Sequence, residues 1–105
     1  MKLAVCIPTR GIITSRTIEA VQAMLDVTGQ CRPDIEIIPK WYISYDKPIP
    51  DGHTDVATRA LNDGADLVLF VEEDVIPPAH ALEAMLVRIV RGADWVFVDY
   101  PLNAM

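Results

Sequence analysis

The chain has 105 residues, a net charge of −6 and a hydrophobic fraction of 51%. This length suits a single domain, 1–105, and the hydrophobic fraction supplies a core, which argues against disorder. The negative charge argues against nucleic-acid binding, because contacts with backbone phosphates need lysine and arginine. An acidic chain still binds a nucleotide when a divalent cation bridges its carboxylates and the phosphates.

The chain carries no run of about 18 apolar residues, so we expect no membrane span. The opening apolar residues meet Pro8 at once, which is typical of a strand and not of a signal peptide. Cys6 lies in that strand and Cys31 in a polar segment, a placement that predicts neither a disulfide framework nor a zinc site. We therefore expect a cytoplasmic protein with reduced cysteines.

The first elements predicted are a buried strand and a helix. Residues 3–7 are continuously apolar and stop at Pro8, which is typical of a strand buried on both faces of a parallel sheet. Thr14 or Ser15 is expected to cap a helix, and Gly29 is expected to lie beyond its end.

The middle of the chain predicts a second strand and a second helix. Residues 35–45 alternate between apolar and polar types, as in an extended strand, and Pro39 within them indicates an edge strand or a bulge. Residues 46–53 are expected to form a loop, because prolines and a glycine interrupt them. Thr54 or Asp55 then caps the predicted helix.

The last third predicts strand, helix and strand. Residues 67–71 are fully apolar, the Pro77–Pro78 pair is expected to start a third helix that Gly92 ends, and residues 95–98 form the final predicted strand. This order predicts an α/β fold with a mostly parallel sheet and helices on both of its faces. Ligands of such sheets bind beyond the carboxyl ends of the strands, where residues 9–11 and 72–74 are expected.

Three carboxylates, Glu72, Glu73 and Asp74, directly follow the predicted strand 67–71. In an extended segment Glu72 and Asp74 point to the same side, where their charges repel each other. A hard divalent cation offsets that repulsion, and Mg²⁺ prefers one or two carboxylates together with phosphate oxygens. The alternative is a solvated acidic turn ahead of a helix, since the helix dipole favours negative charge there.

A resemblance to a known family lies in the segment GADLVLFVEEDVIPPAHALEAML, which resembles the region around the D-x-D motif of family 2 type glycosyltransferases with the GT-A fold. The opening LAVCIPTRG is similar to their first strand and donor-binding loop, and VATRALNDGAD to their helix before the acidic strand. The resemblance covers nearly the whole chain but only the donor-binding half of the family's domain. It implies a Rossmann-like nucleotide-binding half without the acceptor-binding part.

The resemblance also implies a role for each acidic residue. Asp74 corresponds to the acid that coordinates Mn²⁺ or Mg²⁺ on the diphosphate of a UDP- or GDP-sugar. Glu72 stands where an aspartate is commoner and corresponds to the contact with the ribose, or with the metal through water. Glu73, in the middle position, is expected near the donor sugar.

Further nucleotide contacts are implied in two loops. The residues Pro8, Thr9 and Arg10 resemble the loop that faces the base and ribose, and Arg10 is also placed to pair with the diphosphate. The alternative for Arg10 is a solvated loop arginine. Asp46 follows the second predicted strand, where the family often has an acid that holds the uracil or ribose, although the alignment there is loose.

Arg59 resembles the family's helix arginine that helps to bind the diphosphate, although the usual pattern Ala-Arg-Asn differs from Ala-Thr-Arg here. The alternative is a surface ion pair, because Asp55 and Asp63 both lie four residues away on the predicted helix. His53 and His80 are interpreted as surface histidines.

The function that the sequence suggests is a metal-dependent glycosyltransferase domain acting on an unknown acceptor. Two alternatives are a non-catalytic nucleotide- or metal-binding module and an oligomerising α/β module. No residue is assigned as catalytic base, since Asp99 after the last predicted strand comes earlier than the family's base. Apolar surface that an acceptor half would have covered predicts a homo-oligomer.

Overall fold

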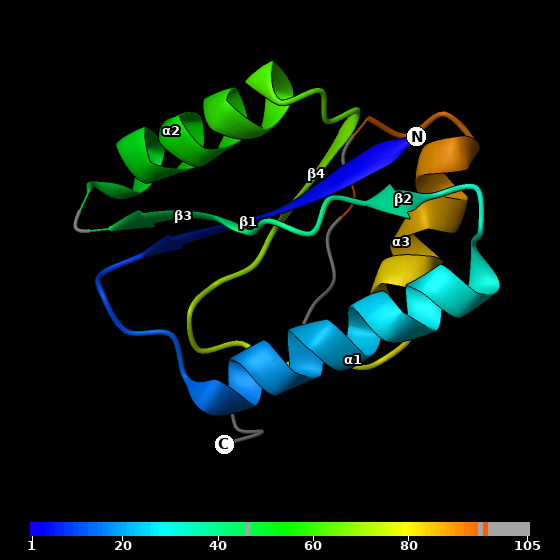
Figure 1. Ribbon diagram of the computed structural model, residues 1–105, viewed down its shortest axis with the longest axis horizontal. Coiled ribbons are helices and arrows are strands. Elements are labelled where there is room, and N and C mark those ends of the chain that lie inside the picture. The colour runs from blue at the N-terminus through cyan, green and yellow to red at the C-terminus, as the bar shows by residue number, and fades with distance from the viewer. Residues whose placement is uncertain (46, 95, 97–105) are drawn as a thin grey trace.

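A computed structural model describes residues 1–45, 47–94 and 96 of the chain. Figure 1 shows three layers, in which a small parallel sheet lies between one helix on one face and two helices on the other. The α/β fold predicted from the sequence is confirmed at this level. The elements in chain order are β1 (Lys2–Thr9), α1 (Ser15–Cys31), β2 (Glu36–Ile37), β3 (Tyr42–Tyr45), α2 (Ile49–Asn62), β4 (Leu67–Phe70) and α3 (Ala81–Val90).

The strand β1 is the centre of the sheet, and every pairing to it is parallel. Residue Leu3 pairs with both β2 and β4, and Cys6 pairs with both β3 and β4. Because a strand has only two edges, β2 and β3 must lie one after the other along the edge opposite β4. The predicted strand 35–45 is therefore two short strands, and the break between them contains Pro39. Among the described residues both strands pair with β1 alone, which confirms the edge strand that this proline indicates.

Alternate residues of β1 point to opposite faces of the sheet and build two separate cores. On one face the side chains of β1 pack against α1 and α3, and on the other they pack against α2. The first core contains Leu3, Val5 and Ile7, and the second contains Ala4 and Cys6. A strand buried on both faces needs the unbroken apolar run that the sequence shows.

The first helix begins as predicted and runs further than predicted. The side chain of Thr14 accepts a hydrogen bond from the N–H of Thr17 at 3.2 Å, which makes it the N-cap of α1. Gly29 does not end the helix, which continues to Cys31. A Cβ added at Gly29 would meet no atom within 4 Å, so this position costs α1 only the low helix propensity of glycine. The buried Thr28 anchors the last turn in the core.

The second helix begins earlier than predicted. The loop prediction for residues 46–53 is wrong over its second half, because α2 starts at Ile49. Pro50 lies in the first turn, where its missing N–H leaves no intrahelical bond unmade. Thr54 is inside the helix and does not cap it, since its hydroxyl donates to the carbonyl of Pro50 at 2.9 Å.

The third helix begins later than predicted. The Pro77–Pro78 pair precedes it in the loop, and α3 starts at Ala81 with His80 as its N-cap residue. Gly92 follows the helix with a φ of 105°, a left-handed conformation that suits glycine, so the predicted end is confirmed. The predicted strand 95–98 lies outside the described residues, except for Val96.

Candidate functional site

A cleft of about 270 Å³ opens at the carboxyl edge of the sheet, where β1, β3 and β4 all end. In Figure 1 the ends of β1 and β3 lie at the left of the view, beside the start of α2. The structure brings together the two clusters that the sequence predicts, because Pro8–Arg10 and Glu72–Asp74 line the same cleft. The other lining residues are Ser44, Lys47, Gly52 and His53.

The cleft opens because β1 and β4 separate beyond Cys6. Even-numbered residues of β1 form hydrogen bonds on the β4 side: the carbonyl of Lys2 accepts from Asp66 N at 2.8 Å and that of Cys6 accepts from Val71 N at 3.0 Å. Pro8 is next in this series and has no N–H to donate. Since β4 has already ended at Phe70, this proline leaves no ladder bond unmade and the two chains diverge.

Glu73 joins the two diverging segments. Its Oε2 accepts hydrogen bonds from the hydroxyl of Thr9 and from the backbone N–H of Arg10, the latter at 2.9 Å. Its backbone carbonyl also accepts from the N–H of Thr14, the N-cap of α1, at 3.1 Å. The Thr9 hydroxyl above all, and then the Arg10 N–H, lower the pKa of the Glu73 carboxyl. We call this set of contacts the Glu73 bridge; through it the residue fixes the two walls of the cleft.

Glu72 and Asp74 present their carboxylates differently from Glu73. Both residues are exposed and line the cleft, and no described residue forms a hydrogen bond or ion pair with either side chain. The expected extended conformation is wrong, because residues 73 and 74 form a turn in which Val75 N donates to the carbonyl of Glu72 at 3.4 Å. The two carboxylates are thus available to a ligand in the cleft.

The described residues contain no group of three or more histidine, cysteine, aspartate or glutamate side chains placed to hold a metal ion. A cation beside Glu72 and Asp74 would therefore take most of its ligands from water and from a bound molecule. Mg²⁺ commonly binds in this way, through one or two carboxylates and substrate phosphates. The donor set of the chain fits a cation that enters together with a phosphorylated ligand.

The β3–α2 side of the cleft contains residues that the sequence did not single out as ligands. Ser44 lies in β3 and Lys47 follows that strand, while Gly52 and His53 belong to the first turns of α2. His53 is partly buried, with its ring 4.8 Å from that of Phe70. Gly52 and His53 were missed because residues 46–53 were expected to be a loop, and an earlier helix start would have placed them at the cleft; Ser44 was expected only as a polar position of the strand 35–45.

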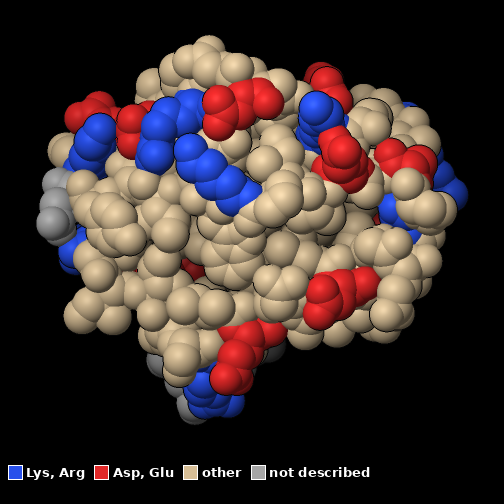
Figure 2. Space-filling model, in the orientation of Figure 1, with Lys and Arg blue, Asp and Glu red and all other residues tan. Residues whose placement is uncertain are grey.

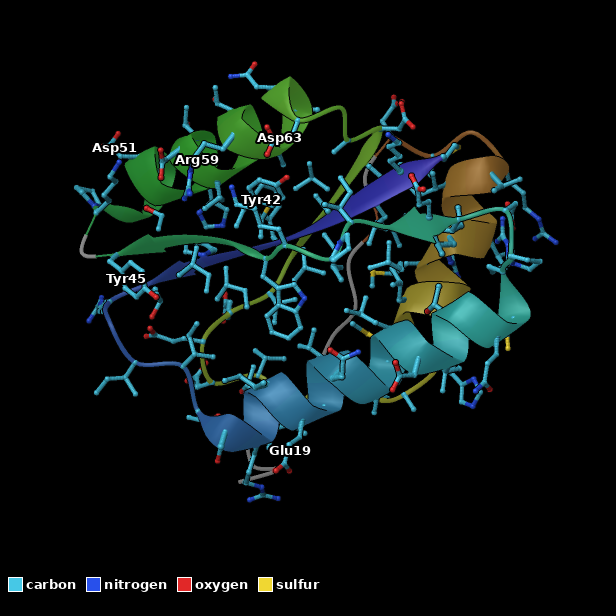
Figure 3. All side chains as sticks on the ribbon, in the orientation of Figure 1. Glu19, Tyr42, Tyr45, Asp51, Arg59 and Asp63 are labelled. Atoms are coloured by element: carbon cyan, nitrogen blue, oxygen red, sulfur yellow. The ribbon has the colours of Figure 1, made fainter. Side chains whose placement is uncertain are left out.

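Arg59 does not line the cleft. Its Nη2 donates to the carbonyl of Ile43 at 2.5 Å and to the carboxylate of Asp55 at 3.1 Å. Figure 3 shows this arginine pointing from α2 toward β3, with Asp63 further along the helix. The ion pair with Asp55 is the alternative that the sequence left open for Arg59, and it ties α2 to the sheet. Asp46, the remaining predicted contact, lies outside the described residues.

No protein-family model matches the chain. No curated protein matches it. No solved structure matches it either.

Proposed function

We propose that the cleft binds a nucleoside-diphosphate sugar, with UDP or GDP as its nucleotide, through Mn²⁺ or Mg²⁺ held between the phosphates and the carboxylates of Asp74 and Glu72. In this proposal the chain is a Rossmann-like, GT-A type donor-binding half of a glycosyltransferase. The observation that carries it is the pair of exposed carboxylates on a cleft wall that the Glu73 bridge fixes at the carboxyl edge of a parallel sheet.

The charges of the cleft favour a ligand that arrives with a cation. Two basic side chains, Arg10 and Lys47, line it together with three carboxylates. A diphosphate without a cation would meet a net negative surface, and its binding would be weakened by repulsion. When bound, a divalent cation offsets that repulsion and stabilises the charge that develops on the leaving diphosphate.

The residues of the chain then bind and orient the donor. The Pro8–Arg10 loop faces the base and ribose, and the Arg10 guanidinium pairs with the diphosphate. The Glu73 bridge keeps that loop at a fixed position relative to Asp74. Transfer also needs an acceptor hydroxyl about 3 Å from the anomeric carbon, beside a base. No described residue is assigned that role, so donor hydrolysis by this chain is expected to be slow or absent.

Self-association is the second part of the proposal. Two large apolar side chains of α3, Val87 and Val90, are exposed at 41% and 63%. Figure 2 shows charged side chains mainly toward the margins of one face and few in its middle. Exposed apolar surface of this kind favours contact with a second copy. Among the described residues, no helix combines the length and the apolar character needed to cross a membrane.

Paramagnetic broadening by Mn²⁺ tests where the cation binds. In the presence of UDP or GDP, Mn²⁺ should broaden the backbone NMR signals of residues 72–74 and 9–10, and Mn²⁺ alone should do so much more weakly. Asp74→Asn should remove the nucleotide-dependent broadening. Asp26→Asn is the matched control, since Asp26 is exposed on α1, away from the cleft lining. Broadening centred elsewhere, or unaffected by Asp74→Asn, would show that the assigned site is wrong.

A further inference from the structure

The hydroxyl of Ser44 is buried and has no hydrogen-bond partner among the described residues. The residue is only 4% exposed, and its Oγ contacts no donor or acceptor of the described chain. Buried polar side chains in folded proteins nearly always have a partner, so an exception at a cleft needs an explanation. Ser44 lines the candidate cleft, where a bound ligand would supply the missing acceptor.

The first turn of α2 lies directly against this hydroxyl. A Cβ built on Gly52 would lie 3.8 Å from Ser44 Oγ and 3.2 Å from the Cβ of Pro8. The glycine thus allows α2 to pack closely against Pro8 and Ser44, since a Cβ at this position would crowd Pro8. Pro48 precedes the helix as its N-cap residue and provides no side-chain hydrogen bond to it. The N–H of Gly52 already donates to the carbonyl of Pro48 at 2.9 Å, and Pro50 has no N–H.

We propose that the β3–α2 side of the cleft is a phosphate subsite that works without a metal ion. Ser44 Oγ donates a hydrogen bond to a phosphate oxygen, and the positive end of the α2 dipole lies on the same side of the cleft, where Gly52 and His53 line it. The Lys47 side chain, which also lines the cleft and pairs with Asp55 at 3.6 Å, adds positive charge. The favoured ligand group is a phosphate ester or a free phosphate, because Ser44 Oγ donates and both Lys47 and the helix dipole are positive; Asp55, which pairs with Lys47, and Asp51 in the first turn of α2 carry the opposing charge.

This subsite is distinct from the proposed cation position. Because β1 lies between β3 and β4, Ser44 and the Glu72–Asp74 turn stand on opposite sides of the end of β1. A ligand that uses both would cross that end, next to Thr9. The inference deepens the proposed function and rests on it for the identity of the ligand, but the binding of phosphate itself does not depend on a metal.

An NMR titration of the full chain with inorganic phosphate and pyrophosphate, in EDTA, tests the subsite. Saturable shifts are expected at the amides of residues 44, 47 and 51–53. Ser44→Ala should weaken this binding about tenfold or more, since a hydrogen bond to a charged group is lost. The variant removes only a hydroxyl that has no partner in the chain, so it should fold. Shifts that are absent, or unchanged affinity in Ser44→Ala, would overturn the proposal.

Two further variants separate this inference from the proposed function. Gly52→Ala should weaken phosphate binding, because the added Cβ crowds Pro8 and pushes α2 away from Ser44, whereas Gly29→Ala, the same change in open surroundings on α1, should not. Asp74→Asn should not weaken metal-free phosphate binding, because it removes a repelling charge from the cleft, while it removes the effect of Mn²⁺ on nucleotide binding. If uridine shifts the amides of residues 44 and 51–53 and phosphate does not, the subsite binds a neutral group and the assignment to phosphate is wrong.

Discussion

The carboxylate of Glu73 accepts a hydrogen bond from the hydroxyl of Thr9, although 64 positions separate the two residues in sequence. The contact spans the point where β1 and β4 diverge. The N–H of Arg10 donates a second hydrogen bond to the same carboxylate oxygen at 2.9 Å. Because of this bridge, the loop after β1 and the acidic turn after β4 form two walls of one cleft. Glu73 thus holds the two walls of the cleft together, and the carboxylates of Glu72 and Asp74 are available to bind a ligand.

Replacement of Glu73 should loosen the loop after β1. In Glu73→Gln the two donors lose a charged acceptor, and hydrogen bonds to an ionised group are roughly twice as strong as neutral ones. Amide hydrogen exchange of Arg10 should accelerate relative to the parent chain. Glu72→Gln is the matched control and should leave that exchange unchanged, because the side chain of Glu72 forms no hydrogen bond or ion pair with a described residue. Equal exchange in Glu73→Gln and the parent would show that the bridge does not hold the loop.

Acid should open the same bridge. The pKa of Glu73 is lowered from its ordinary value of 4.5, chiefly by the Thr9 hydroxyl and then by the Arg10 N–H. A carboxyl whose pKa is lowered by folding stabilises the folded state above its unfolded pKa and loses this contribution as pH falls through the folded value. The Arg10 amide signal should therefore move with a midpoint below pH 4.5, together with the Glu73 side-chain signal. A Glu73 midpoint at or above 4.5 would contradict this account.

Ser44→Ala should not destabilise the protein. A buried polar group without a partner costs about 1–3 kcal/mol, so its removal is expected to be neutral or to raise the free energy of unfolding by up to about that amount. Urea denaturation of the ligand-free chain measures the difference. A loss of more than about 1 kcal/mol would mean that the hydroxyl has a partner in the folded chain. Greater stability combined with weaker phosphate binding is the pattern expected of a residue kept for function.

Self-association should involve the outer face of α3. Val87 and Val90 are three residues apart, so they lie on one face of the helix, where they are 41% and 63% exposed. Light scattering should detect a dimer or a larger species, and Val90→Asp should shift it toward the monomer. Leu61→Asp, at an exposed apolar position on α2, serves as the control. A strictly monomeric parent chain at high concentration would refute the prediction.

Much of the site could be predicted because parallel strands share a carboxyl edge. The apolar runs 3–7 and 67–71 identify two such strands, so the polar residues that follow them had to lie close together. The N-cap at Thr14 could be predicted because its hydroxyl bonds to the N–H of a residue only three positions later, Thr17. The role of Glu73 was not readable, because it depends on how β1 and β4 diverge, which no local pattern encodes.

The other side of the cleft was missed for a different reason. Pro48, Pro50 and Gly52 are turn-formers, and their spacing predicted a loop, but proline is also favoured at the start of a helix. The early start of α2 brings Gly52 and His53 to the cleft. Arg59 was instead expected at the ligand and does not line the cleft, because it forms an ion pair with Asp55, four residues earlier on α2.

The affinity for UDP and GDP with and without a divalent cation is the most direct measure of the central claim. Calorimetry should find binding far tighter in Mn²⁺ than in EDTA, because the cation joins the diphosphate to carboxylates that would otherwise repel it. Asp74→Asn should abolish that difference and retain the fold, while Asp26→Asn should preserve it. Equal affinity in Mn²⁺ and EDTA, or a difference that survives Asp74→Asn, would contradict a cation-bridged nucleotide at this cleft.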